Sequence, residues 1–372
     1  MMTSGISGFV FDAWLASASM PSGLLLKILE QYGEPESCHD AFRRNSADLT
    51  DYIPPRFYRI LKGNDSDEFL NKMDAMMKKH SIRVIRIHDA AYPEALADIS
   101  EPPAMLFYQG NPNCLNGKIL AMVGSRKASY TGQKATARLS EELSRKGVSI
   151  VSGLACGIDA SAHQGCIDGG SPTIAVTGCG LDRVYPADNR TLRDRILNGG
   201  GILLSEYAPG EKPAGWHFPV RNRIITGIAE ALILMEARIR SGSLTSVHHA
   251  LDQGKDVFVY PGDPSSEYFE GNHQLLREGG TFFTSAEDIL EDLGWLDNKP
   301  TVRHNNGCLT AAEVFTPEEK LITDTLKPGS LSFEELLNHT GIEPSGLLST
   351  LTILQIRGIV EALPGKKYQI KH

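Results

Sequence analysis

Six short apolar runs recur in the middle of the chain, and each one stops at a polar loop that contains Gly, Ser or Glu. The runs are residues 119–123, 148–151, 173–176, 202–204, 231–235 and 257–260. Continuous apolar runs of this length, rich in β-branched side chains, are typical of strands buried on both faces of a parallel sheet. The pattern therefore predicts six parallel strands in one sheet.

The loops after these runs are expected to lie together, because the carboxyl ends of parallel strands meet at one edge of a sheet, where ligands bind. They carry glycines, hydroxyl groups and Arg126. Backbone N–H groups, hydroxyls and a guanidinium together suit a polyanion.

Helical segments separate the predicted strands, for example residues 131–147 and 241–254, and glycines stand before several strands as helix C-caps would. The runs RVIRI and AMLFYQ, which begin at Arg83 and Ala104, are predicted lead-in strands. Alternating strands and helices with right-handed crossovers predict an α/β fold with a doubly wound sheet over residues 82–295.

The segments on either side have a different character. Residues 1–78 have apolar positions at helical spacing, which predicts a small all-α domain of SAM-like or helix-hairpin-helix type, for docking or for DNA contact. Residues 297–307 are polar with Pro and Gly and are typical of a linker. Residues 308–372 predict three helices and a two-stranded ribbon, which is a winged helix. Its third helix has few side chains that could read bases, so this domain could bind protein instead of DNA.

Composition narrows the class of protein. The 372 residues have 41% hydrophobic and 22% charged side chains, a net charge of −8 and no apolar stretch of membrane-spanning length, which predicts a cytoplasmic protein with no membrane partner. Any nucleic-acid binding must come from a local basic surface. The six cysteines form no CxxC pair and no zinc spacing, so neither a metal site nor a cofactor is expected.

The first strand–loop–helix junction has the sequence GSRKAS, which begins at Gly124. Gly lets the backbone approach a ligand, the Ser hydroxyls donate, and the helix start faces an anion. The loop has neither the Walker A pattern nor the GxGxxG dinucleotide pattern. The alternative to an anion-binding loop is a tight strand-to-helix turn that has only a structural role and carries a surface arginine.

Two further loops carry candidate chemistry. Asp159 and His163, four residues apart, are predicted to be a structural pair in which the carboxylate orients the imidazole. Phe218 stands beside Arg221 and Arg223 in a segment predicted to be a loop, and an extended backbone would point both arginines the same way. An aromatic ring with adjacent cations suits single-stranded nucleic acid. In the alternative, Phe218 is a core residue and the arginines pair with the acidic residues Glu206 or Glu236 at strand ends.

Together and in this order, the segments GSRKAS, SGLACGIDASAH, TIAVTGCGLDRVYP, LLSE, FPVRNRII, MEARIRSGSL and VFVYPG resemble the DNA-processing protein DprA/Smf family over roughly residues 82–293. The resemblance implies an extended Rossmann-type fold and a non-enzymatic protein that binds single-stranded DNA. It also implies a homodimer that protects incoming DNA and loads the recombinase RecA during natural transformation.

Carried over motif by motif, the resemblance also implies a set of DNA-binding residues. Phe218 matches the base-stacking aromatic, and the others match phosphate-binding or neighbouring positions. The implied set is Ser125, Arg126, Ser152, Gly153, Phe218, Arg221, Asn222, Arg223, Ser241 and Gly242. Leu275 and Leu276 are implied contributors to the dimer interface. The chain departs from the family pattern at TSV after SGSL, where ITA is usual, and at His273, where Asn is usual.

Two other functions stay open. One is a nucleotide-binding Rossmann-type enzyme such as a phosphoribohydrolase, although the chain lacks the PGGxGTxxE-type signature of that class, and its nearest stretch begins at Pro261. The other is a protein-interaction adaptor that no longer uses the polar edge of the sheet. Nucleoside release by the purified chain would favour the enzyme, and binding of RecA without DNA would favour the adaptor.

Overall fold

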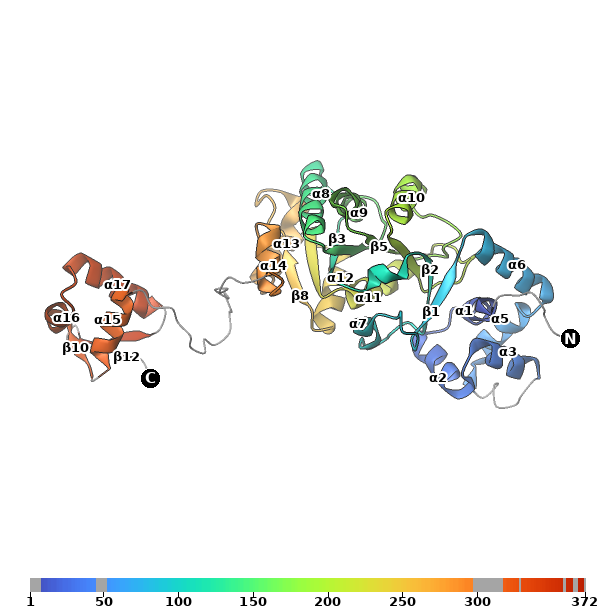
Figure 1. The fold of residues 1–372 in the computed structure, drawn as a ribbon, viewed down its shortest axis with the longest axis horizontal. Coiled ribbons are helices and arrows are strands. Elements are labelled where there is room, and N and C mark those ends of the chain that lie inside the picture. The colour runs from blue at the N-terminus through green and yellow to red at the C-terminus, as the bar shows by residue number, and fades with distance from the viewer. Residues whose placement is uncertain are drawn as a thin grey trace. The chain divides into compact units, whose positions relative to one another are not determined.

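The structure is a computed structural model that describes residues 8–44, 52–296, 317–327, 329–356, 359–363 and 367–370. The chain divides into two compact units, residues 1–301 and 302–372 (Figure 1). The first unit is built around a nine-stranded sheet, and the second contains a three-stranded sheet.

The six apolar runs form the parallel centre of the large sheet, as predicted. They are β3 (Ile119–Gly124), β4 (Ser149–Ser152), β5 (Thr173–Val176), β6 (Ile202–Ser205), β7 (Ala231–Glu236) and β8 (Asp256–Val259). Neighbouring strands in the order β6-β5-β4-β3-β7-β8 are all parallel. The fold prediction of a doubly wound α/β sheet is confirmed.

Three more strands extend the sheet at its two ends. The predicted lead-in strands are β1 (Arg83–Arg86) and β2 (Met105–Gly110), and β2 pairs antiparallel with β6, while β1 pairs antiparallel with β2. At the other end β9 (Thr281–Phe282) pairs parallel with β8. The sheet is therefore mixed, with an antiparallel pair at one end.

Helices cover both faces of the sheet because alternate residues of each strand point to opposite sides. Along β3, Leu120 and Met122 pack toward α8 (Tyr130–Arg145), α9 (Ile158–Gly169) and α14 (Ala286–Asp292). Ala121 and Val123 pack on the other side, in a core that includes residues of α7 (Glu94–Ala97), α11 (His217–Ile228), α12 (Ser243–Asp252) and α13 (Glu270–Arg277). The remaining elements are α10 (Arg190–Asn198) and the 3-10 turns η1 (Pro112–Leu115), η2 (Ala187–Asn189) and η3 (Glu267–Phe269).

The N-terminal segment is helical, as its apolar spacing indicates. Its helices are α1 (Phe9–Ala16), α2 (Ser22–Tyr32), α3 (Pro35–Arg43), α5 (Pro55–Gly63) and α6 (Asp67–Lys79). Their buried side chains share one hydrophobic cluster with residues of β1 and β2, such as Val84 and Phe107. Buried Asp12 also accepts hydrogen bonds of 2.8 and 2.9 Å from Arg86 of β1. The helices thus pack directly on the sheet within the first unit, and the boundary near residue 80 stays a prediction.

The second unit has the elements of a winged helix. They are α15 (Pro317–Leu326), β10 (Leu331–Ser332), α16 (Phe333–Thr340), α17 (Pro344–Ile356), β11 (Val360–Leu363) and β12 (Lys367–Ile370). The predicted ribbon of β11 and β12 gains β10 as a third strand. Ser332 and Glu335 form a reciprocal capping box at the start of α16. The predicted linker, residues 297–307, lies outside the described residues.

Two features are absent from the described residues. None of the described helices is long and apolar enough to cross a membrane. Nor does this part of the chain bring three or more His, Cys, Asp or Glu side chains together in a group that could hold a metal ion.

Candidate nucleic-acid interface

A cleft of about 720 Å³ opens where the strand order reverses, beside β3 with β4 on one side and β7 on the other. This switch point is where doubly wound sheets bind ligands. Its lining includes seven of the implied site residues: Ser125, Arg126, Phe218, Arg221, Asn222, Ser241 and Gly242. The structure thus brings together residues that are far apart in the sequence.

Glu236, at the end of β7, fixes the loop between β3 and α8. Its fully buried carboxylate accepts 3.0 Å hydrogen bonds from Ser129 N and a 2.5 Å bond from Ser129 Oγ. Its carbonyl accepts from Ser125 N at 2.8 Å. A Cβ at Gly132 would lie only 2.2 Å from the Glu236 carboxylate, so glycine is required there. The interpretation that Glu236 pairs with an arginine is therefore wrong, because its oxygens already serve the β3–α8 loop.

The start of α9 packs against the β3–α8 loop on the side opposite to β7. Gly157 has a φ of +76°, and a Cβ there would lie 2.4 Å from Ser125 O. Ile158 N donates to that same carbonyl at 3.2 Å. The loop is consequently held by β7 and α9 together, with Arg126 and Lys127 exposed on it.

The segment Phe218–Arg223 lies in α11 and not in a loop, so the expectation that Arg221 and Arg223 point the same way is wrong. Residues two apart on a helix point in different directions. Arg221 turns inward and is 3% exposed, and Arg223 points to another site. The helix was missed because the aromatic and Pro residues at its start obscure the periodicity.

Arg221 forms the floor of the cleft. It donates to Gly153 O at 2.7 Å and to Val176 O, and a Cβ at Gly153 would lie 2.5 Å from its guanidinium. Burial lowers the pKa of Arg221 to about 10, a change that the negative charge of Asp159 opposes. Burial raises the pKa of Asp159, which the positive charge of Arg221 opposes. Arg221 therefore stays charged at neutral pH and contributes to the potential of the cleft from below.

Arg223 lies outside the cleft. Its guanidinium donates to both carboxylate oxygens of Glu206, at 2.9 and 2.6 Å, to Ser22 Oγ at 3.0 Å and to Glu101 O at 2.9 Å. This agrees with the alternative in which an arginine pairs with Glu206. The residue ties α11 to the end of β6 and to α2.

Aromatic side chains meet Arg126 at the mouth of the cleft. The Arg126 Cζ lies 4.6 Å from the centroid of the Phe218 ring, which is a cation–π contact. The Tyr185 ring stacks on the Phe218 ring with centroids 5.4 Å apart. Phe218 therefore belongs to the site and not to the core, and Tyr185 is a cleft residue that the sequence reasoning did not single out.

The start of α12 closes the far side of the cleft. Ser241 Oγ lies 2.7 Å from Ser243 Oγ, and Gly242 is the residue before the helix. Ser243 and Ser246 of the first turn also line the cleft. The N-terminus of a helix attracts anions through its free N–H groups and its dipole.

The cleft is strongly basic although the chain is acidic. Its lining has five cations and a single carboxylate, which is that of Asp159. Three of those cations, Lys127, Arg238 and Arg240, were missed from sequence. The RxR spacing just before SGS was the available signal, because two cations beside a Gly–Ser loop at a strand end suit an anion. Arg238 contacts Glu267 at 3.0 Å, and it lies over the Tyr268 ring.

The remaining predicted residues have structural contacts. Ser152 is buried and donates to Met122 O at 2.7 Å, so it does not reach the cleft. The predicted Asp159–His163 pair is wrong, since His163 Nδ1 bonds Thr173 Oγ1 at 2.8 Å and Asp159 accepts from Ala155 N. Burial lowers the pKa of His163 to about 3.

The residues implied in dimer contacts lie on α13. Leu275 is 8% exposed and belongs to the core on that face of the sheet, and Leu276 packs partly against the same core. His273 Nε2 lies 2.8 Å from Pro261 O, which ties α13 to the loop after β8. Its neighbour Asn272 bonds Ala237 N and Tyr260 O, each at 2.8 Å.

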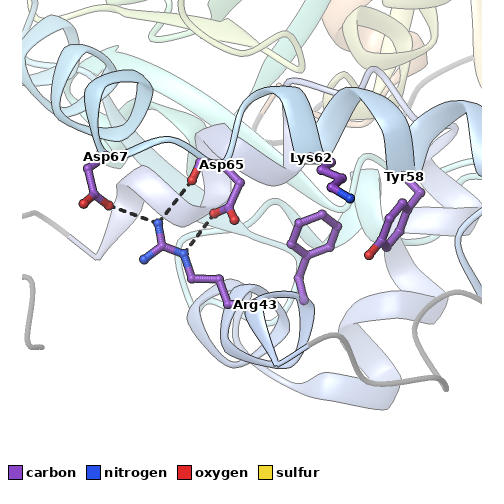
Figure 2. A pocket seen from close by; sticks show the side chains of 6 residues that line it. Arg43, Tyr58, Lys62, Asp65 and Asp67 are labelled. Atoms are coloured by element: carbon purple, nitrogen blue, oxygen red, sulfur yellow. Dashed lines mark hydrogen bonds and ion pairs between the residues drawn. The ribbon is translucent and has the colours of Figure 1, made fainter.

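A second cavity, of about 480 Å³, lies among the N-terminal helices (Figure 2). Arg43 donates to Asp65 and Asp67 at 3.0 and 3.1 Å, and Lys62 is the other cation of its lining. Two cations and two carboxylates balance, so this cavity lacks the charge that an anion would require. The cleft at the switch point is the better candidate.

Two family models and several known proteins match this chain. The family model described as DNA recombination-mediator protein A matches residues 83–294, and the model described as the DprA winged helix domain matches residues 310–366. The chain is 38% identical to DNA processing protein DprA of Streptococcus pneumoniae over 283 residues, which cover 75% of this chain and 95% of that protein. It is 33% identical to protein Smf of Escherichia coli, covering 74% of each chain.

Solved structures give the same result. The X-ray structure of DNA processing protein A from Streptococcus pneumoniae matches with a TM-score of 0.64 and 36% identity, over 77% of this chain and 98% of that one. A structure of the Helicobacter pylori protein, described for its single-stranded DNA binding mode, matches with a TM-score of 0.51 and 27% identity, over 57% of this chain and 95% of that one.

Proposed function

Because the chain belongs to the DprA/Smf family of DNA-processing proteins, we propose that it binds single-stranded DNA in the switch-point cleft and acts without catalysis as a recombination mediator. In this proposal it protects incoming strands and delivers them to RecA during natural transformation. The observation that carries the proposal is the pairing of five cationic side chains with an aromatic stack in one open cleft.

The chemistry of the cleft fits a flexible single strand better than a duplex. Cations along a groove track phosphates, and aromatic rings stack on bases that are free of a partner strand. In a duplex the base faces are covered, so the Phe218 and Tyr185 rings would have nothing to stack on. The start of α12 at Ser243 lines the cleft and adds the positive end of a helix dipole beside it.

The first experiment is a titration of a fluorescein-labelled oligo-dT and of the matching duplex, read by anisotropy at two salt concentrations. Tight binding that prefers the single strand and weakens with salt is expected. Absence of binding at low salt would overturn the proposal. A further assay, with the strand coated by a single-strand-binding protein, asks whether the chain speeds RecA filament growth, as a loader must.

The alternative of a nucleotide-handling enzyme would use the same switch-point cleft, but the stretch nearest to its signature lies elsewhere. The stretch nearest to its signature includes Gly262, whose φ is +60° and against which the Phe269 ring packs so closely that a Cβ would lie 2.1 Å from it. Neither Pro261 nor Gly262 lines the cleft. Incubation with nucleoside monophosphates, followed by chromatography for released base, checks this alternative directly.

We also propose that the protein forms a homodimer through the α13–β9 end of the sheet. Strand β9 is the last in the sheet order, and Phe282 on it is 56% exposed. Leu276 is half-buried on α13, whereas Leu275 faces the core, so Leu276 and Phe282 are the expected contacts. Light scattering should give a dimer mass, and Phe282→Lys should shift it toward the monomer. A dimer mass that persists in this variant would contradict the assignment of the interface.

A further inference from the structure

Phe218 is half-buried and already has contacts to its ring. The Arg126 guanidinium lies over it, the Tyr185 ring stacks on it, and a Cβ at Gly178 would come within 2.9 Å of Phe218 Cδ1. An incoming base would have to displace one of these neighbours to lie against Phe218. The outer aromatic of this stack is Tyr185, which is 44% exposed and lines the cleft.

The loop that carries Tyr185 is fixed on both sides of it. Before it, Asp182 accepts a 2.7 Å hydrogen bond from Gly210 N, and Arg183 donates to Gly210 O at 3.0 Å. After it, the Asn189 amide donates to Leu154 O at 2.9 Å. A ring held in place in this way loses little conformational entropy when a ligand stacks on it. It also keeps its position when no ligand is bound.

We propose that Tyr185 is the residue on which a nucleobase of the bound strand stacks, with Phe218 supporting the tyrosine ring from behind and Arg126 contacting Phe218 in turn. This inference rests on the proposed binding of single-stranded DNA in the cleft. It adds a base-contacting residue to that function. Stacking on a tyrosine tolerates every base, since each base offers a flat aromatic face, so the contact adds affinity without sequence preference.

The test compares Tyr185→Ala, Tyr185→Leu and Tyr185→Phe on oligo-dT and on an abasic strand of equal length. Loss of one stacked base predicts about 5- to 150-fold weaker binding of oligo-dT by the Ala and Leu variants. The Phe variant should stay within about two-fold of the unaltered protein, because it keeps the ring. On the abasic strand all variants should bind within about two-fold of one another. Tyr52→Ala is the matched control, since Tyr52 is equally exposed at 44% but lies outside the cleft.

Three results would overturn the assignment of Tyr185. Unchanged oligo-dT binding by the Ala variant would mean that no base stacks there. Full affinity of the Leu variant would mean that Tyr185 only packs against Phe218. An equal loss on the abasic strand would mean that the ring shapes the cleft for phosphates. In all three cases the unaltered protein still binds oligo-dT, whereas failure of the unaltered protein to bind it would remove the proposed function and this inference together.

Discussion

At the scale of single residues, the arginines of the motifs differ in what they can do. Arg126 is exposed at the mouth of the cleft, Arg221 is buried beneath it, and Arg223 is fully engaged elsewhere. The sequence shows three similar cations, because it does not reveal which neighbours each guanidinium meets after folding.

Arg126→Ala should weaken binding of every single-stranded sequence and lower the salt slope by about 0.7, because one phosphate contact is lost. Anisotropy titrations over a series of salt concentrations measure that slope. Arg138→Ala is the matched control, since this arginine is exposed on α8 outside the cleft and pairs only with Glu142 among the interactions described for it. A slope that Arg126→Ala leaves unchanged would remove Arg126 from the phosphate contacts.

Arg221→Ala cannot test phosphate contacts in the same way, because it also destabilises the fold. Removing this buried guanidinium leaves the Asp159 carboxylate buried without its compensating charge, which costs on the order of 3–5 kcal/mol of stability. Binding by this variant is therefore interpretable only beside its unfolding curve, which should shift far more than that of Arg126→Ala.

His163 predicts a pH dependence of stability. Burial holds its folded-state pKa at about 3, below the ordinary value of 6.5, so the unfolded chain takes up a proton that the folded chain does not. This contribution to stability is complete above the unfolded pKa and is lost as pH falls from about 6.5 toward 3. Between pH 7 and pH 5 the free energy of unfolding should fall by about 2 kcal/mol from this group.

Urea unfolding of the unaltered protein, His163→Gln and the control His248→Gln at both pH values measures this effect. His248 is exposed and provides the matched surface replacement. His163→Gln should reduce the difference between the two pH values. An unreduced difference would assign the acid sensitivity to other groups.

At the scale of elements, the strands could be predicted and α11 could not. An apolar run such as residues 231–235 is typical of any strand buried on both faces of a parallel sheet. The local sequence is therefore enough to predict such a strand. The α11 helix starts with His217, Phe218 and Pro219 and buries polar arginine side chains, so its pattern is not that of an ordinary amphipathic helix. The contact of Tyr185 with Phe218 joins two distant segments, and no spacing within one segment reports it.

Arg223 should matter for the placement of α11. Arg223→Met leaves Glu206 without its cationic partner in a mostly buried site, with only the Ser22 hydroxyl still donating to it, which should cost on the order of 3 kcal/mol. Adding Glu206→Gln should restore part of that loss. Chemical denaturation of the single and double variants gives the coupling energy. Additive losses would show that the pair does not act as a unit.

At the scale of the whole molecule, the two units have separate cores. The second unit buries its own cluster around Leu336, Leu347 and Leu351. A chain that ends at Leu296 should therefore keep the unfolding transition of the first unit and bind oligo-dT within about three-fold of the full chain. Calorimetry of both chains should show the transition of the second unit only in the longer one. A large loss of affinity on truncation would place part of the DNA contact in the winged helix.

The charge distribution of the first unit has a practical consequence. The chain is net negative, yet its cleft is positive, so the surface outside the cleft is more negative than the total suggests. Such a protein should elute from an anion exchanger as an ordinary acidic protein does, and still be retained on immobilised heparin, whose sulfated chain can enter the groove. The isoelectric point alone is therefore a poor guide to its chromatography, because a resin interacts with the local charge of the surface that contacts it and not with the net charge.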